Sequence, residues 1–404
     1  MTKITQRADL TFKFNRSLGR HGWLRLTPAY SVKIVQSLVA NCPKRTRVLD
    51  PFSGTGTTAL VAAEHGNEAQ AYDINPFLIW LGNVKCRSYS DLEVEQIRAR
   101  SLAAIKRAES CVSEKNWRPP IFNIERWWAP NTLNVLAAIR ESIELEFGPP
   151  DVASCGGLVW VAFCRLVIET SSAAFNHVSM SFAKQADHFE FSHVASLFTG
   201  ILEPILESSA GELPGTAQVS EVDARHIPNG KKKFGKVITS PPYPNRISYI
   251  RELRPYMYWT GFLKEAREAG ELDWKAVGGT WGVASSRLLD WEPDAHELPP
   301  SLAKVVASIA KADSKHAKLL SAYVMKYFHD MALHFRALRN VLAPSAELHY
   351  IVGNSTFYGN MVDTSLLLSE AMTAAGFHSI TSTVIRKRNC NKALFEYDVS
   401  AVWE

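Results

Sequence analysis

The sequence predicts a doubly wound α/β fold, in which a mostly parallel sheet carries helices on both faces. The apolar run 47–49 has strand character, the glycine-containing segment 50–58 follows it, and residues 59–65 have the pattern of a helix. A second short strand, 70–72, ends at Asp73. Two strands joined by a crossover helix run parallel, and such units build doubly wound sheets.

The rest of the chain alternates between helical periodicity and strand-like runs. We expect helices at 30–41, 91–110, 131–147, 153–171, 323–339 and 364–375, and strands at 217–223, 236–238, 347–352, 379–385 and 397–403. The stretch between Asp73 and the strand at 217–223 is too long for a loop, which predicts an inserted helical subdomain. We therefore divide the chain into an N-terminal part (1–84), a helical insertion (85–215) with a possible role in target recognition, and a C-terminal part (216–404). Residues 264–317 are rich in charged and small residues and predict a second, less ordered insertion.

Composition is typical of a folded protein with a sizeable core. The chain has 404 residues, of which 46% are hydrophobic, and a formal net charge of +5, which permits a nucleic-acid partner without requiring one. Its six cysteines include no C-x-x-C pair, so we expect reduced thiols and no metal site. The N-terminus lacks an apolar signal region, and the longest apolar stretch, 152–168, is interrupted by Arg165. We expect a cytoplasmic protein without a membrane span.

Segment 50–58 reads Asp-Pro-Phe-Ser-Gly-Thr-Gly-Thr-Thr and predicts a cofactor loop. Gly54 and Gly56 allow a close backbone approach to a ligand, although a plain tight turn would also use them. Asp73 follows at roughly the 20-residue spacing at which an acidic side chain meets ribose hydroxyls.

A second motif, Ser240-Pro241-Pro242-Tyr243, follows the strand at 236–238. Together the two motifs resemble those of DNA amino-methyltransferases, and the resemblance covers residues of about 20–85 and 215–404. It implies a seven-stranded, Rossmann-like methyltransferase sheet with an antiparallel last strand, S-adenosyl-L-methionine as cofactor and double-stranded DNA as substrate. The Ser-Pro-Pro-Tyr form is usual in cytosine-N4 enzymes, whereas Asp- or Asn-Pro-Pro-Tyr favours adenine N6, with exceptions on both sides.

The resemblance also assigns roles at the cofactor. The glycine loop would wrap the amino-acid end, Asp73 would hold the ribose, and Ile74 or Phe77 would pack on the adenine. Asp223 would bind the adenine amino group or act as a plain strand-end cap, and Thr27 would bind the methionine carboxylate or cap a helix. The full predicted cofactor set is Thr27, Asp50, Pro51, Phe52, Ser53, Gly54, Thr55, Gly56, Thr57, Asp73, Ile74, Asn75 and Asp223.

The predicted catalytic set is Ser240, Pro241, Pro242 and Tyr243. An exocyclic amino group is a poor nucleophile because its lone pair is delocalised into the ring. The Ser240 hydroxyl oxygen and the Pro241 carbonyl can act as acceptors that localise this lone pair, and the two prolines stiffen the turn. Tyr243 offers an aromatic face to a base taken out of the stack. The chain has no Pro-Cys pair, which excludes C5-cytosine chemistry.

Several basic segments are candidates for DNA phosphate contacts or for solvated loops. They are Lys231–Lys233 with Lys236, then Arg246, Arg251 and Arg254, and finally Arg386–Arg388 with Lys392. Gly353-Asn354-Ser355 either shapes the base pocket or forms a simple turn, and we expect Trp127 and Trp128 in the core. Three alternatives to a cytosine-N4 enzyme remain: an adenine-N6 enzyme, an RNA methyltransferase and a catalytically silent DNA-binding protein. A cognate restriction endonuclease would be a natural partner, but the sequence specifies neither it nor the recognition sequence or oligomeric state.

Overall fold

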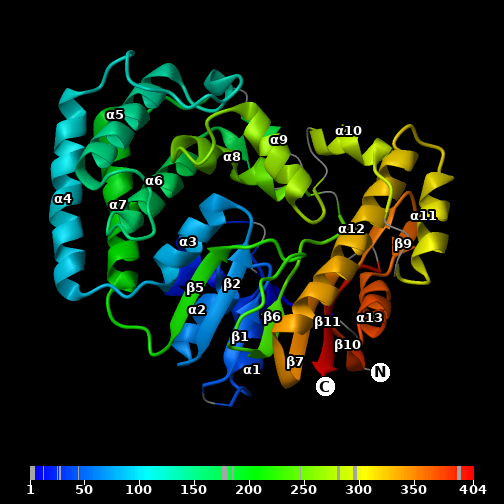
Figure 1. The fold of residues 1–404 in the computed structure, drawn as a ribbon. Helices are drawn as coiled ribbons and strands as arrows, with labels where there is room; N and C mark the ends of the chain where they lie inside the picture. The colour runs from blue at the N-terminus through cyan, green and yellow to red at the C-terminus, as the bar shows by residue number, and fades with distance from the viewer. Residues whose placement is uncertain are drawn as a thin grey trace.

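The computed structural model describes residues 5–11, 13–24, 26, 29–43, 45–174, 181–183, 186–245, 247–279, 283–293, 298–388 and 393–404. At its centre lies a seven-stranded sheet of order β10-β11-β7-β6-β1-β2-β5 (Figure 1). Strand β11 runs antiparallel to both of its neighbours, and the pairs among β5, β2, β1, β6 and β7 are parallel. This confirms the predicted doubly wound sheet. The strands are β1 (Arg47–Asp50), β2 (Glu68–Asp73), β5 (Thr216–Glu221), β6 (Phe234–Thr239), β7 (Leu342–Gly353), β10 (His378–Lys387) and β11 (Phe395–Trp403).

Both faces of the sheet are covered by helices. Val48 and Ile238 pack into a cluster with the first two helices of the chain, whereas Leu49 and Val237 pack against two later helices. Neighbouring strand residues point to opposite faces, so a strand buried on both sides shows a continuous apolar run rather than an alternating one. The helices are α1 (Val32–Val39) and α2 (Thr57–Glu64) on the first face, and α12 (Ala317–Leu338) and α13 (Thr364–Ala374) on the second.

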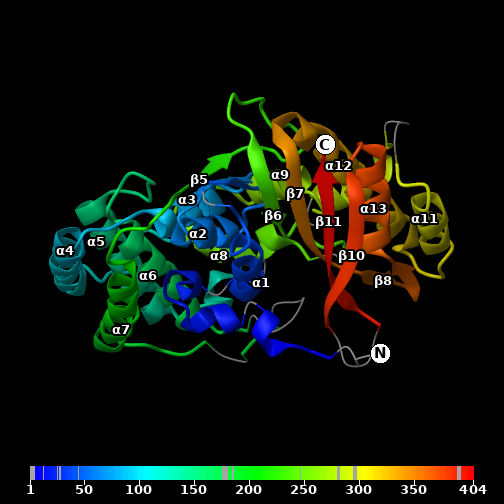
Figure 2. The ribbon, with the colours of Figure 1, turned by 90° about the horizontal axis from the view of Figure 1, so that it is seen from below.

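Four long helices form a lobe beyond the β5 edge, which Figures 1 and 2 show at one end of the sheet. We call it the helical lobe: α4 (Asp91–Ser110), α5 (Pro130–Phe147), α6 (Gly157–Glu169) and α7 (Phe191–Ser209). Its two ends lie side by side, because Tyr89 forms bridges with Ala210 and Gly211. The Arg20 guanidinium donates to the carbonyl oxygens of Lys85, Arg87 and Ser209 and so ties both ends together. This geometry supports an insertion, and the boundaries at 84 and 215 stay predictions.

The core of the helical lobe continues into α8 (Tyr249–Trp259), which begins shortly after the Ser-Pro-Pro-Tyr motif. The Trp259 ring lies edge-on to Trp128, with ring centroids 5.7 Å apart, and Arg140 donates to the Trp259 carbonyl at 2.9 Å. Trp127 and Trp128 are buried, as predicted. The segment after the motif is therefore anchored in the helical lobe as well as in the sheet.

The prediction of low order in residues 264–317 is wrong for the described part. Three helices occupy it, and the Arg287 guanidinium binds the Glu271 carboxylate with two hydrogen bonds. Leu302, Val306 and Ile309 recur at helical spacing and are buried against α12, whereas Arg267 and Glu268 on α9 and Lys304 on α11 are exposed. These charged residues thus lie on solvated helix faces. The helices are α9 (Ala266–Lys275), α10 (Val283–Asp290) and α11 (Leu302–Ala310).

Helices α7 and α3 (Pro76–Cys86) also lack a counterpart in the sequence prediction, and α3 packs against β5. Helix α6 begins at Gly157, later than the predicted position 153. No helix among the described residues is long and apolar enough to cross a membrane. The remaining short elements are strands β3 (Ala173–Ala174), β4 (Ser181–Phe182), β8 (Ser355–Phe357) and β9 (Asn360–Val362), with 3-10 turns at Ala8–Leu10, Phe14–Ser17, Gly19–Gly22, Ile124–Arg126 and Arg339–Val341.

Candidate active site

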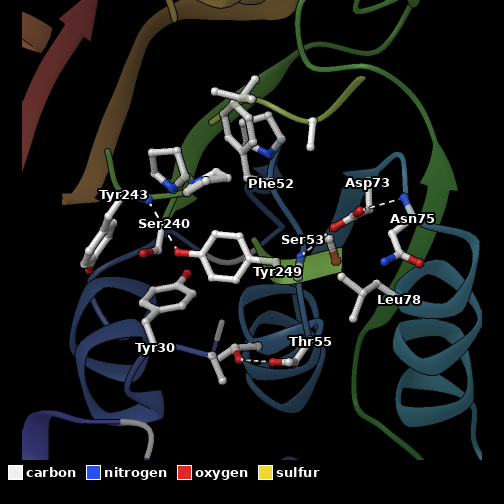
Figure 3. Close-up of a pocket in the computed structure, with 18 of the residues that line it drawn as sticks. Tyr30, Phe52, Ser53, Thr55, Asp73, Asn75, Leu78, Ser240, Tyr243 and Tyr249 are labelled. Carbon is white, nitrogen blue, oxygen red and sulfur yellow. Dashed lines mark hydrogen bonds between the residues drawn. The ribbon is translucent and has the colours of Figure 1, made fainter. Parts of the chain in front are cut away.

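A cavity of about 270 Å³ lies at the carboxyl ends of β1, β2, β5 and β6. Figure 3 shows Ser240 and Tyr243 at one end of it and Asp73 and Asn75 at the other. The two motifs, far apart in the sequence, thus share one space. The predicted residues that line it are Pro51, Phe52, Ser53, Gly54, Thr55, Thr57, Asp73, Ile74, Asn75, Asp223, Ser240, Pro241, Pro242 and Tyr243. Asp50 and Gly56 are not among its lining residues, and Thr27 lies outside the described residues.

The glycine loop needs both of its glycines. Gly54 and Gly56 have φ values of 51° and 75°, which L side chains rarely adopt. A Cβ atom at position 56 would also lie 3.2 Å from the Cα of Gly82 in α3, so this position is tight as well as strained. Ser53 is held by its backbone N–H, which donates to the Tyr72 carbonyl at 2.8 Å. Its buried hydroxyl has no hydrogen-bond partner among the described residues and lines the cavity.

Asp73 ends β2 and is tied to the glycine loop. One carboxylate oxygen accepts from the Gly54 N–H at 2.9 Å and the other from the Asn75 N–H at 2.9 Å. Burial raises the pKa of this carboxyl to about 6, although these backbone hydrogen bonds act in the opposite direction. Asn75 in turn caps α3, because its side-chain oxygen accepts from the Phe77 N–H. The strand end therefore presents a preorganised carboxylate to the cavity.

Asp50, the first residue of the loop motif, is buried and is not among the residues that line the cavity. Its carboxylate accepts from the Thr239 hydroxyl at 2.6 Å and from the Phe52 N–H at 3.1 Å. Burial raises the pKa of Asp50 to about 6. This side chain links the end of β1 to the end of β6, so it braces the two motifs against each other.

Asp223 lines the cavity, but Arg225 engages both of its carboxylate oxygens. The guanidinium donates to them at 2.9 and 2.7 Å, and the Arg225 N–H adds a further bond at 2.9 Å. Burial alone would raise the pKa of Asp223, and the hydrogen bonds from Arg225 outweigh it and lower the pKa. Arg225 also donates to buried Asp330 on α12 at 3.1 Å. The bond from the Arg225 N–H to the Asp223 carboxylate is a strand-end cap, the alternative that we gave for Asp223 beside adenine binding.

Of the two residues predicted as alternatives for adenine contact, Ile74 and Phe77, one lines the cavity. Ile74 lines it, whereas Phe77 is fully buried and stacks on Tyr256 in the core of the helical lobe. Leu78, one residue further along α3, takes a place in the lining. Lys275, the last residue of α9, and the next two residues, Ala276 and Val277, also line the cavity. No sequence motif predicted them as site residues.

Ser240 has one clear hydrogen-bond role. Its hydroxyl donates to the Ile351 carbonyl on β7 at 2.9 Å. Because the single proton is used in this bond, the oxygen is left to act as an acceptor. It lies beside the two prolines and faces the cavity (Figure 3).

Tyr243 is held from three sides. Its hydroxyl donates to Glu396 on β11 at 2.9 Å, and its backbone N–H meets the Tyr249 hydroxyl at 3.5 Å. The Arg388 guanidinium lies over one face of the ring, 4.9 Å from the centroid, and donates to the Asn354 carbonyl at 2.9 Å. Burial, and after it the Glu396 charge, raise the pKa of Tyr243 well above its usual range, so the phenol stays protonated.

The loop Gly353-Asn354-Ser355 has a structural part in this arrangement. A Cβ atom at position 353 would lie 2.3 Å from a terminal nitrogen of Arg388 and 2.9 Å from the Tyr243 ring. The Asn354 side chain accepts from the Phe395 N–H at 2.8 Å and so fixes the start of β11. This loop therefore shapes the end of the cavity that holds Ser240 and Tyr243.

The basic segments divide by position. Lys231–Lys233 precede β6 and so lie at its amino end, opposite the edge that carries the cavity, and Lys236 is buried in an ion pair with Glu347 at 2.8 Å. Arg386 and Arg388 line the cavity. Arg251 and Arg254 are half-buried on α8, and Arg246 and Lys392 lie outside the described residues.

Metal and thiol chemistry find no support in the part of the chain described. No group of three or more His, Cys, Asp or Glu side chains among those residues has a geometry that could hold a metal ion. The cysteines described are free thiols, and burial raises the pKa of Cys86 to about 12, which makes it a poor nucleophile.

Comparisons with known proteins point to one family. A family model described as "D12 class N6 adenine-specific DNA methyltransferase" matches residues 32–144, which include the glycine loop and end before Ser240. Type II methyltransferase M.BsoBI of Geobacillus stearothermophilus is 22% identical over 97% of this chain and 85% of its own length. Type II methyltransferase M.MvaI of Kocuria varians is 20% identical over 84% of this chain and 77% of its own length.

The structural matches are distant. TrmN from Thermus thermophilus is 11% identical, with a TM-score of 0.30, over 96% of this chain and 53% of TrmN. The rRNA methyltransferase aviRa from Streptomyces viridochromogenes is 12% identical, with a TM-score of 0.28, over 93% of this chain and 86% of aviRa. The family assignment rests on the sequence matches and on the two motifs that meet at one cavity. These findings support an S-adenosylmethionine-dependent DNA amino-methyltransferase family for this chain.

Proposed function

We propose that this methyltransferase acts on the exocyclic N4 of a cytosine extruded from DNA, with Ser240, Pro241, Pro242 and Tyr243 as the catalytic residues. The observation that carries the proposal is the hydrogen bond from the Ser240 hydroxyl to the Ile351 carbonyl. It leaves the Ser240 oxygen as an acceptor in the cavity that the glycine loop also lines. An amino group that acts as a nucleophile needs a hydrogen-bond acceptor for its N–H, because this bond orients the nitrogen so that its lone pair can face the methyl group.

The cofactor end of the cavity fits S-adenosylmethionine. The Ser53 hydroxyl is buried, unpartnered among the described residues and directed at the cavity, so it can bind the polar amino-acid end. The Asp73 carboxylate can accept from ribose hydroxyls, and Ile74 and Leu78 offer apolar contact to the adenine. Bound there, the cofactor supplies an electrophilic methyl group.

Ser240 would then accept one N–H of the target amino group and draw the nitrogen towards tetrahedral geometry. The lone pair would form the new N–C bond to the methyl group that the cofactor supplies, the demethylated cofactor would be the leaving group, and the proton that the amino nitrogen loses would pass to water. Catalysis of this kind depends on positioning and preorganised electrostatics and needs no covalent intermediate. Tyr243 would support the base by stacking. Because Arg388 covers one ring face, a stacked base uses the other face or displaces the guanidinium.

Adenine N6 is the second candidate target, and a specific observation favours it. The matching family model is the one comparison here that names a base, and that base is adenine. Its match ends at residue 144 and covers the cofactor half, whereas the target nitrogen meets the motif at 240–243. The serine in that motif is our reason for placing cytosine first.

Nucleoside mass spectrometry of DNA from cells that express the chain tests the target base. N4-methylcytosine within a short defined sequence supports the proposal. N6-methyladenine instead would assign the enzyme to the second candidate. Methylation found in RNA and not in DNA would overturn both.

A partner nuclease is a further part of the proposal. M.BsoBI and M.MvaI are named Type II methyltransferases, which supports a role for this chain beside a restriction endonuclease. The expected result is that DNA from expressing cells resists cleavage by an endonuclease of the same recognition sequence, and that DNA from cells with the Ser240→Ala variant does not.

Asp73 gives the first mutational prediction. Asp73→Ala should weaken S-adenosylmethionine binding by about 1.5–3 kcal/mol, because charge-assisted bonds to the ribose are lost. The ionised carboxylate is the acceptor, and burial raises its pKa to about 6. Affinity should therefore be constant above that pH and fall as the pH drops through 6 and the carboxylate is protonated. Calorimetry at a series of pH values checks both effects.

The control is Asp73→Asn, whose side chain cannot ionise. This variant should bind S-adenosylmethionine weakly at every pH, without the further fall in affinity below pH 6 that is expected for wild type. Asp50 also has a pKa raised to about 6, but it does not line the cavity and is present in both wild type and Asp73→Asn. A pH dependence that came from Asp50 would therefore appear in both proteins. The same pH profile in wild type and Asp73→Asn would show that another group controls cofactor binding.

A further inference from the structure

A buried carboxylate lies at the catalytic end of the cavity, outside both sequence motifs. Glu396, the second residue of β11, is 4% exposed and lines the cavity. One of its oxygens accepts from the Tyr243 hydroxyl at 2.9 Å. Buried carboxylates are rare unless paired, so this contact requires an explanation.

Arg386 supplies the pairing charge. It lies directly opposite Glu396 in the antiparallel ladder between β10 and β11. Its guanidinium donates to the two Glu396 oxygens at 2.7 and 3.1 Å. This geometry fixes the carboxylate on the sheet, in the manner of bidentate arginine–carboxylate pairs. Glu396 is thus a rigid acceptor rather than a mobile side chain.

The acceptor determines where the Tyr243 ring lies. Position 353 has no side chain, and a Cβ atom there would come within 2.9 Å of the ring edge. The ring is therefore confined by Gly353 at its edge, by Arg388 over one face and by Glu396 at its hydroxyl. A ring held in one orientation loses less entropy when it stacks on a base than a freely rotating one.

Stability alone gives a poor reason for this carboxylate. A buried ion pair contributes little net free energy of folding, because the desolvation of both charges offsets their attraction. The Arg386–Glu396 pair nevertheless lies within hydrogen-bond distance of the Tyr243 hydroxyl. Its second function, as the acceptor for Tyr243, is specific to that place.

We propose that Glu396, held by Arg386, is a positioning residue for target-base capture, because it anchors the Tyr243 hydroxyl and fixes the face that the base meets. This inference rests on the proposed function, in which Tyr243 stacks on the extruded base. It makes the closing β10–β11 hairpin a part of the catalytic end of the cavity.

A double-mutant cycle tests the inference. Methyl transfer from isotope-labelled S-adenosylmethionine to unmethylated DNA is measured as kcat and KM for wild type, Glu396→Ala, Tyr243→Phe and the double variant. Glu396→Ala should lower kcat/KM for DNA by about tenfold, the lower end of the effect of a hydrogen bond to a charged group. Cofactor affinity should stay within about twofold of wild type. In the Tyr243→Phe background, which lacks the hydroxyl, the same change should have little further effect.

Two further variants separate positioning from a structural role. Glu396→Gln keeps an oxygen that can accept from Tyr243 and should restore most of kcat/KM. Glu347→Ala is the matched control, because Glu347 also pairs with a buried cation on this sheet, at 2.8 Å from Lys236, but does not line the cavity. It should leave kcat/KM unchanged.

An undiminished effect of Glu396→Ala in the Tyr243→Phe background would overturn the inference, as would a folded Glu396→Gln protein without rescue. Isotope-labelled tyrosine NMR provides a readout that does not need catalysis. The Tyr243 ring, identified by its loss in Tyr243→Phe, should flip slowly in wild type and faster in Glu396→Ala. If wild type transfers no methyl group, the proposed function fails, and equal flip rates would overturn the positioning independently.

Discussion

Replacing Ser240 by alanine should slow methyl transfer by about 10²–10³-fold, the range observed when one preorganised polar group is removed from a reacting centre. The hydroxyl oxygen is the acceptor left free after its proton is donated to the Ile351 carbonyl at 2.9 Å. Without it, the amino lone pair stays delocalised in the base. Single-turnover kinetics with labelled cofactor would measure the rate directly.

The loss should be confined to the chemical step. Cofactor affinity in Ser240→Ala should equal that of wild type, because Ser53 and Asp73 lie at the other end of the cavity (Figure 3). Ser369→Ala is a matched control, since its hydroxyl also donates to a backbone carbonyl, that of Ser365 at 2.8 Å, but on α13. A Ser240→Ala protein with full single-turnover rate would remove Ser240 from the catalytic set.

Tyr243→Ala should have the second-largest effect and act at a different step. The loss of stacking on one extruded base corresponds to about 1–3 kcal/mol, roughly 5–150-fold in apparent DNA affinity. Tyr243→Phe retains the ring and should keep most of the stacking, losing only the anchor to Glu396. Binding titrations with DNA in the presence of the demethylated cofactor would separate the two variants.

The contrast between steps makes this prediction specific. Tyr243→Ala should raise KM for DNA more than it lowers kcat, whereas Ser240→Ala should do the reverse. Equal DNA affinity in Tyr243→Ala and wild type would mean that the base does not stack on this ring. The catalytic role would then have to come from another aromatic side chain of the cavity, such as Tyr249 or Tyr30.

Local sequence signals predicted the features that depend on local sequence. A strand followed by glycines, and a strand followed by two prolines, placed both motifs at strand ends, and the carboxyl ends of parallel strands meet at one edge. The seven predicted strands correspond to the seven strands of the sheet. Helix α4 was predicted from its periodicity with its observed limits, and the structure shows a capping box of Ser90 and Glu93 at its start.

The remainder depended on tertiary contacts. Glu396 follows Tyr243 by 153 residues, and only the pairing of β11 with β7 brings it to the cavity. Lys275–Val277 line the cavity from the end of α9, in a segment whose charged and small residues suggested low order. Phe77 and Leu78 are both apolar, and the orientation of α3 decides that the second lines the cavity.

The most direct test of the account uses the purified protein, isotope-labelled S-adenosylmethionine and unmethylated DNA, followed by mass spectrometry of the digested nucleosides. The account predicts label on an exocyclic amino group, at cytosine N4, with a rate that Ser240→Ala reduces by about 10²–10³-fold. Label at cytosine C5 would contradict the noncovalent amino-transfer mechanism. A folded protein that binds the cofactor and leaves the DNA unlabelled would contradict the account as a whole and indicate a catalytically silent DNA-binding protein.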